Sequence, residues 1–137
     1  MNFESCLNNK TAKKIDADLL RAKSMFISSE QAIYTVRLIP LSDKTSKSIF
    51  RELYEALKET FEAIGYIKGY KFLDHASIFY FIKDFLKKEN LSNMFDRYRK
   101  LRNGINYYGE SISLESVKES LEDIPETVKN LKNDYFT

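Results

Sequence analysis

The residues with the clearest chemical potential form a run of charged, amide and aromatic side chains, Arg97-Tyr-Arg-Lys-Leu-Arg-Asn-Gly-Ile-Asn-Tyr-Tyr-Gly109. At about 100° per residue, a helix through this run has an apolar stripe centred near Tyr98, and Arg102 falls at the edge of that stripe. A guanidinium group partly removed from water needs a carboxylate, carbonyl groups or an anionic ligand for its donors. We therefore expect Arg102 either to bind an anion or to pair with an internal acid, for which Glu30 is the candidate.

Other polar residues of the run fall on the same side of the predicted helix. Arg99 and Asn106 lie just outside Arg102, and Asn103 follows it directly. Guanidinium and amide groups in one strip suit the recognition of phosphate or of a nucleic-acid backbone. The strip predicts a binding site for such a group, with Arg102 as its anchor.

Two segments resemble the HEPN domains of prokaryotes, especially small archaeal ones. They are Arg102-Asn-Gly-Ile-Asn-Tyr-Tyr-Gly109 and the earlier Gly69-Tyr-Lys-Phe-Leu-Asp-His75. By helix order and spacing, the resemblance covers residues 15–133. It implies an up-and-down helical bundle that forms a homodimer, with the motif helices of the two protomers facing each other. It also implies either metal-independent endoribonuclease activity or binding of RNA or protein without cleavage.

The chain departs from the catalytic pattern of that family. In active members an arginine and a polar residue precede a histidine, with four to six residues between arginine and histidine. Arg102 and Asn103 match the first two, but the window for the histidine holds Tyr107, Tyr108 and Gly109. Imidazole can exchange protons near pH 7, whereas tyrosine, with a reference pKa of about 10, is a poor base.

The tyrosines fit RNA binding better than RNA cleavage. Tyr107 points away from the apolar stripe, so it can contact a dimer mate or stack on an RNA base, while Tyr108 lies toward the stripe and is expected to pack. We therefore predict RNA binding through Arg99, Arg102, Asn103, Asn106 and Tyr107. If the protein is an enzyme, the resemblance assigns catalysis to Arg102 and Tyr107.

The single histidine, His75, lies outside the catalytic motif, directly after Asp74. A lone histidine near the start of a helix usually caps or packs. We expect that role here.

Two other kinds of function remain open. The missing motif histidine and the net charge of +2 also fit a regulatory module that pairs with a minimal nucleotidyltransferase, as in a toxin–antitoxin system. A small-molecule pocket between helices, lined by Tyr and Phe, is the other alternative.

The pattern of apolar residues predicts about five helices in an antiparallel all-α bundle. A first helix is expected over 11–39, because apolar residues recur at steps of three and four without a break. A second is expected to end at Gly65 and Gly69, and a third to begin after Asp74. A fourth is expected to be capped by Asn90 or Ser92 and to end at Gly109, and a fifth to open at Ser113 and kink at Pro125.

Length and composition fit one HEPN-like domain over 1–137, with residues 1–10 as a frayed N-terminus. The one cysteine excludes an internal disulfide, no Cys/His cluster suggests a metal, and we expect no cofactor. Apolar runs are too short to cross a membrane, so a cytoplasmic protein is expected.

Charge is distributed unevenly along the chain. From Lys83 to Arg102 there are seven Lys and Arg against three Asp and Glu, whereas from Glu110 to Glu126 there are six acids and one lysine. This asymmetry fits either a basic binding surface or simple attraction between the fourth and fifth helices.

Overall fold

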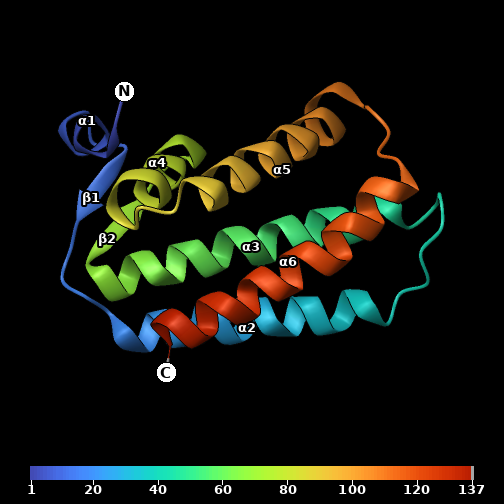
Figure 1. Cartoon of the computed structure of the whole chain (residues 1–137), viewed down its shortest axis with the longest axis horizontal. Coiled ribbons are helices and arrows are strands. Elements are labelled where there is room, and N and C mark those ends of the chain that lie inside the picture. Colours follow the sequence, from blue (N-terminus) through green and yellow to red (C-terminus); the bar gives the residue numbers. More distant parts are fainter. Residues whose placement is uncertain (137) are drawn as a thin grey trace.

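The computed structural model describes residues 1–136 and consists of six α-helices, a π-helical turn and one small sheet (Figure 1). The helices are α1 (Phe3–Asn8), α2 (Leu19–Arg37), α3 (Ser46–Lys68), α4 (His75–Tyr80), α5 (Glu89–Tyr108) and α6 (Leu114–Tyr135). The π-helical turn, Phe81–Phe85, continues α4. The strands are β1 (Ala12–Lys14) and β2 (Tyr70–Phe72). The predicted all-α bundle is therefore confirmed.

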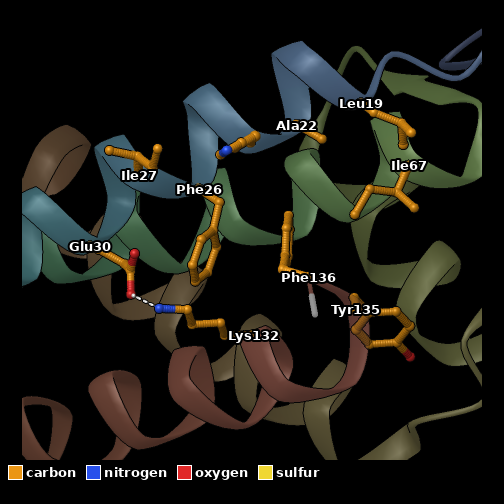
Figure 2. Close-up of a pocket in the computed structure, with 10 residues that line it drawn as sticks. Leu19, Ala22, Phe26, Ile27, Glu30, Ile67, Lys132, Tyr135 and Phe136 are labelled. Carbon is orange, nitrogen blue, oxygen red and sulfur yellow. Dashed lines mark hydrogen bonds and ion pairs between the residues drawn. The ribbon is translucent and has the colours of Figure 1, made fainter.

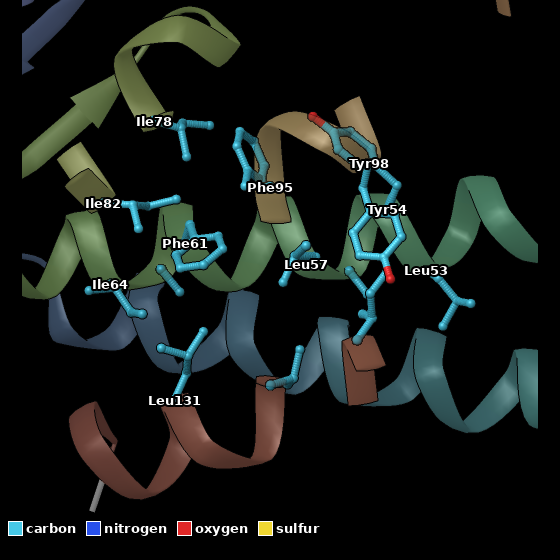
Figure 3. Close-up of a cluster of buried hydrophobic side chains, with 14 of the residues drawn as sticks. Leu53, Tyr54, Leu57, Phe61, Ile64, Ile78, Ile82, Phe95, Tyr98 and Leu131 are labelled. Carbon is cyan, nitrogen blue, oxygen red and sulfur yellow. The ribbon is translucent and has the colours of Figure 1, made fainter. Parts of the chain in front are cut away.

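Helix α3 is the centre of the bundle. The long helices α2, α3, α5 and α6 alternate in direction along the chain, and in the view of Figure 1 α5 and α2 lie on opposite sides of α3. Large apolar side chains of α3 meet those of α4, α5 and α6 in one core (Figure 3). Tyr54, Phe61 and Phe95 are among the largest of the fully buried side chains. The Phe95 ring of α5 packs against Tyr54 and Phe61 of α3, and burial of these rings helps to hold α5 in place.

Glycine has two different roles near the end of α3. Gly69 caps the helix in the left-handed conformation, with φ of 86°, as predicted. Gly65 does not end the helix, because it lies inside α3 under the ring of Phe72. There it allows β2 to approach the helix closely.

The N-terminus is not frayed, contrary to the prediction for residues 1–10. Asn2 and Ser5 form a reciprocal capping box at the start of α1. The backbone N–H of Phe3 donates to Asp84 Oδ2 over 2.8 Å, and the Phe3 ring packs against Phe81. Burial of Phe3 and Cys6 therefore ties α1 to the π-helical turn.

The first long helix begins later than the predicted residue 11. Ala12–Lys14 instead pairs antiparallel with Tyr70–Phe72, and α2 begins at Leu19 after the N-cap Asp18. Ala12 is buried as the pattern predicted, but it is buried as part of strand β1. Its match to the helical spacing is therefore a coincidence. From Ala22 to Val36 the predicted inward face is confirmed, with no break at Ser28.

Most of the other predicted helix ends are confirmed. Asp74 accepts from Ser77 N over 2.8 Å to cap α4, and Ser113 caps α6. Gly109 ends α5 with φ of 63°. The start of α5 was predicted wrongly, because the helix begins at Glu89 rather than after Asn90 or Ser92. Helix α6 continues through Pro125, as the unbroken register predicted.

Attraction between the two charged helices accounts for part of the charge asymmetry. Arg97 of α5 lies 3.2 Å from Glu119 and 3.7 Å from Asp123 of α6. Tyr98 donates a hydrogen bond to Asp123 over 2.8 Å beside this ion pair. The opposite side of α5 carries its remaining arginines away from α6.

No helix in residues 1–136 is both long enough and apolar enough to cross a membrane.

Candidate functional site: a buried arginine on α5

Arg102 is buried, with only 8% of its surface exposed. This agrees with its predicted place at the edge of the apolar stripe. The predicted pairing with Glu30 is wrong, because Glu30 lies 3.2 Å from Lys132 of α6. Within residues 1–136, no carboxylate forms an ion pair with Arg102.

The guanidinium of Arg102 instead contacts His75 at the start of α4. Its Nη2 lies 2.6 Å from His75 Nε2, and His75 Nδ1 lies 2.7 Å from the hydroxyl of Tyr54 on α3. Arginine can only donate, so Nε2 accepts and the ring proton must sit on Nδ1, which donates to the Tyr54 hydroxyl. Three helices therefore meet in one chain of hydrogen bonds, Arg102–His75–Tyr54.

Burial and charge keep His75 neutral in this position. Burial lowers the pKa of His75 to about 4, and the positive charges of Arg102, Lys58 and Arg99 act in the same direction. Burial also raises the pKa of Tyr54 far above its usual value, against the opposing effect of Arg102. Neither group exchanges protons easily near pH 7.

One donor of Arg102 is unused. Its Nε atom is buried and is the one such side-chain atom in residues 1–136 without a hydrogen-bond partner. The guanidinium carbon lies 5.1 Å from the centre of the Tyr54 ring and 6.0 Å from that of Tyr107. Aromatic faces stabilise the cation, but they do not satisfy an N–H donor that points along the guanidinium plane. This leaves Arg102 with an unmet requirement for an acceptor.

Two of the other predicted site residues, Arg99 and Asn106, have partners of their own. Arg99 donates to Asp96 over 2.8 Å. Asn106 accepts from Arg51 of α3 over 2.7 Å. Asn103 is half-buried. We call Arg51, Arg99, Arg102, Asn103, Asn106 and Tyr107 the α5 strip.

The end of α5 carries two exposed aromatic side chains. Tyr107 is 68% exposed, as predicted, and the ring is free to stack on a base. Tyr108 is 77% exposed, so the prediction that it packs against the apolar face is wrong. The last buried residue of α5 is Ile105, and the helix continues to its cap at Gly109. The two tyrosine rings lie on this final, exposed turn.

Sequence reasoning missed three members of the site: Arg51, Tyr54 and His75. Arg51 and Tyr54 lie on α3 among residues that read as an ordinary amphipathic helix, and no local signal identifies them. His75 was noted as the single histidine, but its contact with Arg102 joins residues 27 positions apart. A pairing of that kind depends on how α4 and α5 cross.

An aromatic cleft also exists, away from the α5 strip. It lies between α2 and α6, has a volume of about 440 Å³ and is lined by Phe26, Tyr135 and Phe136 among others (Figure 2). The rings of Phe26 and Phe136 stack with centres 4.3 Å apart, and the Lys132–Glu30 ion pair lies beside them. None of the predicted site residues lines this cleft.

Within residues 1–136, no three His, Cys, Asp or Glu side chains lie close enough together to hold a metal ion. Comparisons with known proteins gave no match to a family model, to a curated protein or to a solved structure. The resemblance to HEPN domains therefore stands on the two sequence segments described above.

Proposed function

We propose that the protein is a HEPN-like domain that binds RNA through the α5 strip and does not cleave it. The observation that carries this proposal is the buried guanidinium of Arg102, which has no carboxylate partner in residues 1–136 and an Nε donor without an acceptor. A phosphate group beside the guanidinium would supply the missing negative charge.

The surroundings of Arg102 favour an extended anion over an isolated one. Arg51, which binds Asn106, adds positive charge, whereas the charge of Arg99 is offset by Asp96. Asn103 and Asn106 add amide groups. Tyr107 provides an exposed ring at the end of the strip. Cationic side chains with an exposed aromatic ring near them suit a single strand, whose phosphates repeat and whose bases can stack.

The same geometry argues against cleavage. Attack by a ribose 2′-hydroxyl requires a group that accepts its proton. The Nε2 atom of His75 already accepts from Arg102, and the His75 pKa of about 4 makes the ring a weak base. The raised pKa of Tyr54 excludes a phenolate as the base near pH 7. To act as the base, Tyr107 would first have to give its hydroxyl proton to a group near that side chain.

The proposal is tested by measuring the affinity of the purified protein for labelled single-stranded RNA in EDTA, by fluorescence anisotropy over a range of salt concentrations. We expect Arg102→Gln to weaken binding about tenfold or more. The slope of log K against log salt should also fall by about 0.7, the loss of one phosphate contact to a single strand. His75 and Tyr54 remain in this variant, and its thermal unfolding shows whether the fold survives.

Arg97→Gln is the matched control, because it removes an arginine from the side of the same helix that faces α6. It should bind RNA almost as well as the parent. Equal affinities of the Arg102→Gln protein and the parent would remove the basis of the proposal. Appearance of shorter RNA in EDTA with the parent, absent with Arg102→Gln, would show a nuclease instead.

A further inference from the structure

The outward face of α2 carries exposed apolar side chains among polar ones such as Ser24 and Gln31. Of the eleven large hydrophobic residues that are exposed in the described chain, six lie between Leu19 and Ile39. Leu20, Ile27, Tyr34 and Leu38 form a line on the side of α2 opposite its buried residues; we call them the α2 strip. Leu20 is 84% exposed and Tyr34 is 68% exposed. The outward face of a surface helix is ordinarily polar, and a line of this kind marks an interaction surface.

Three residues of the α2 strip, Leu20, Ile27 and Tyr34, are spaced symmetrically about Ile27. Leu20 lies seven residues before Ile27, and Tyr34 lies seven residues after it. If two copies of α2 pack antiparallel with the two-fold axis at Ile27, Leu20 of each copy lies against Tyr34 of the other. The seven-residue repeat keeps these residues in one seam along both helices.

Charges beside the α2 strip favour the same arrangement. Lys23 and Glu30 lie on one edge of the strip, four residues before and three residues after Ile27. In the antiparallel pair, Lys23 of each copy faces Glu30 of the other. Glu30 remains half-buried and bound to Lys132, so its carboxylate can accept a second lysine. Antiparallel helix dipoles also attract each other.

We propose that the α2 strip is the interface of a homodimer, in which α2 of a second copy packs antiparallel across a two-fold axis at Ile27. A second copy is the occupant because the apolar spacing about Ile27 and the charges of Lys23 and Glu30 match those of a second α2 in the opposite direction, as a two-fold interface requires. This interface differs from the one that the resemblance implies, in which the motif helices, here α5, face each other. The α2 strip has no residue in common with the α5 strip, so the dimer is independent of the RNA-binding proposal.

The first test measures the mass of the full chain in solution by sedimentation equilibrium over a range of concentrations. We expect a dimer for the parent and a monomer for Ile27→Asp, which places two carboxylates at the axis. Leu73→Asp is the control, because Leu73 is a similarly exposed apolar residue outside α2; this variant should remain dimeric. Circular dichroism and thermal unfolding confirm that each variant folds. A parent that stays monomeric, or a dimer that survives Ile27→Asp, overturns the proposal.

The second test determines the direction of packing by disulfide cross-linking. Ile27→Cys should cross-link to itself, because the two copies of residue 27 meet at the axis. Leu20→Cys should not, since its two copies lie about 21 Å apart in the antiparallel pair. A mixture of Leu20→Cys and Tyr34→Cys proteins should cross-link to each other. The buried Cys6 of the parent serves as the background control. Self-cross-linking of Leu20→Cys shows parallel packing and overturns the arrangement.

Discussion

Arg102 occupies a position where a bundle of this kind would ordinarily place an apolar side chain or a paired charge. Its neighbours are a neutral imidazole and two aromatic rings, none of which cancels the charge of a guanidinium. Removing a cation from water without a counter-charge costs roughly several kcal/mol. The buried Arg102 therefore lowers the stability of the free protein. An anionic ligand that neutralises Arg102 should therefore stabilise the protein when it binds.

The protonation of His75 gives a prediction for stability against pH. The ring has a pKa of about 4 in the folded protein and about 6.5 when unfolded, so the unfolded chain binds the proton first as the pH falls. The free energy of unfolding should drop between pH 7 and pH 5, by about 1 kcal/mol after allowance for solvent near the half-exposed ring.

Urea unfolding of the parent and of His75→Gln at several pH values between 7 and 5 measures this effect. The glutamine amide retains a hydrogen-bond acceptor for Arg102 but does not titrate in this range. The variant should lose the extra pH dependence. If both proteins lose stability equally over this range, His75 is not held neutral by its surroundings.

At the scale of the elements, the site depends on how closely α4 and β2 approach α3. Asp74 caps α4 and sets the direction in which His75 enters the core. Just before it, β2 crosses α3 at Gly65, where the Phe72 ring covers the helix. The position of His75 therefore depends on the close contact between the backbone of Gly65 and the ring of Phe72.

A matched pair of glycine substitutions tests this contact. A Cβ at residue 65 would lie 2.5 Å from Cε2 of Phe72 and 3.1 Å from the carbonyl oxygen of Tyr70. Neither group can move easily, so Gly65→Ala should destabilise the protein by about 1 to 3 kcal/mol. At Gly104 of α5 the nearest atoms belong to the exposed, flexible carboxylate of Glu110.

Gly104→Ala should leave stability unchanged or raise it by up to about 1 kcal/mol, because alanine is the better helix former. Thermal unfolding of the two variants provides the comparison. Equal losses in both proteins would indicate a general sensitivity to glycine replacement rather than a close approach of β2 to α3.

At the scale of the whole molecule, α3 separates the two proposed surfaces. The α5 strip lies on one side of this helix and the α2 strip on α2, which occupies the other side in Figure 1. Side chains of α3 are fully buried between them, including Leu53, Leu57 and Ile64. The two surfaces have no residue in common, so they should act independently.

This independence is measurable with the variants already described. The monomeric Ile27→Asp protein should bind a short single-stranded RNA with the affinity per chain of the parent, within about twofold. The Arg102→Gln protein should keep the dimer while it loses RNA affinity. A large fall in RNA affinity on Ile27→Asp would show instead that both copies contribute to one RNA site.

The helices and most of their ends could be predicted from the sequence because their causes are local. Periodic apolar residues determine which face of α3, α5 and α6 is buried, and Asp74, Ser113 and Gly109 act on backbone groups within a few residues. The same periodicity placed Arg102 at the edge of the core. It also extended the first helix wrongly to residue 11, since three residues of a strand can match a helical spacing by chance.

Only the tertiary structure decided what surrounds Arg102. The contacts with His75 and Tyr54 and the pairing of β1 with β2 join residues far apart in the chain. No helical or strand period relates such residues, because their distance depends on how helices cross and pack. By itself the sequence therefore determined the helices and the buried place of the arginine. The crossing of α3, α4 and α5 determined that this arginine meets a neutral histidine and, within residues 1–136, no acid.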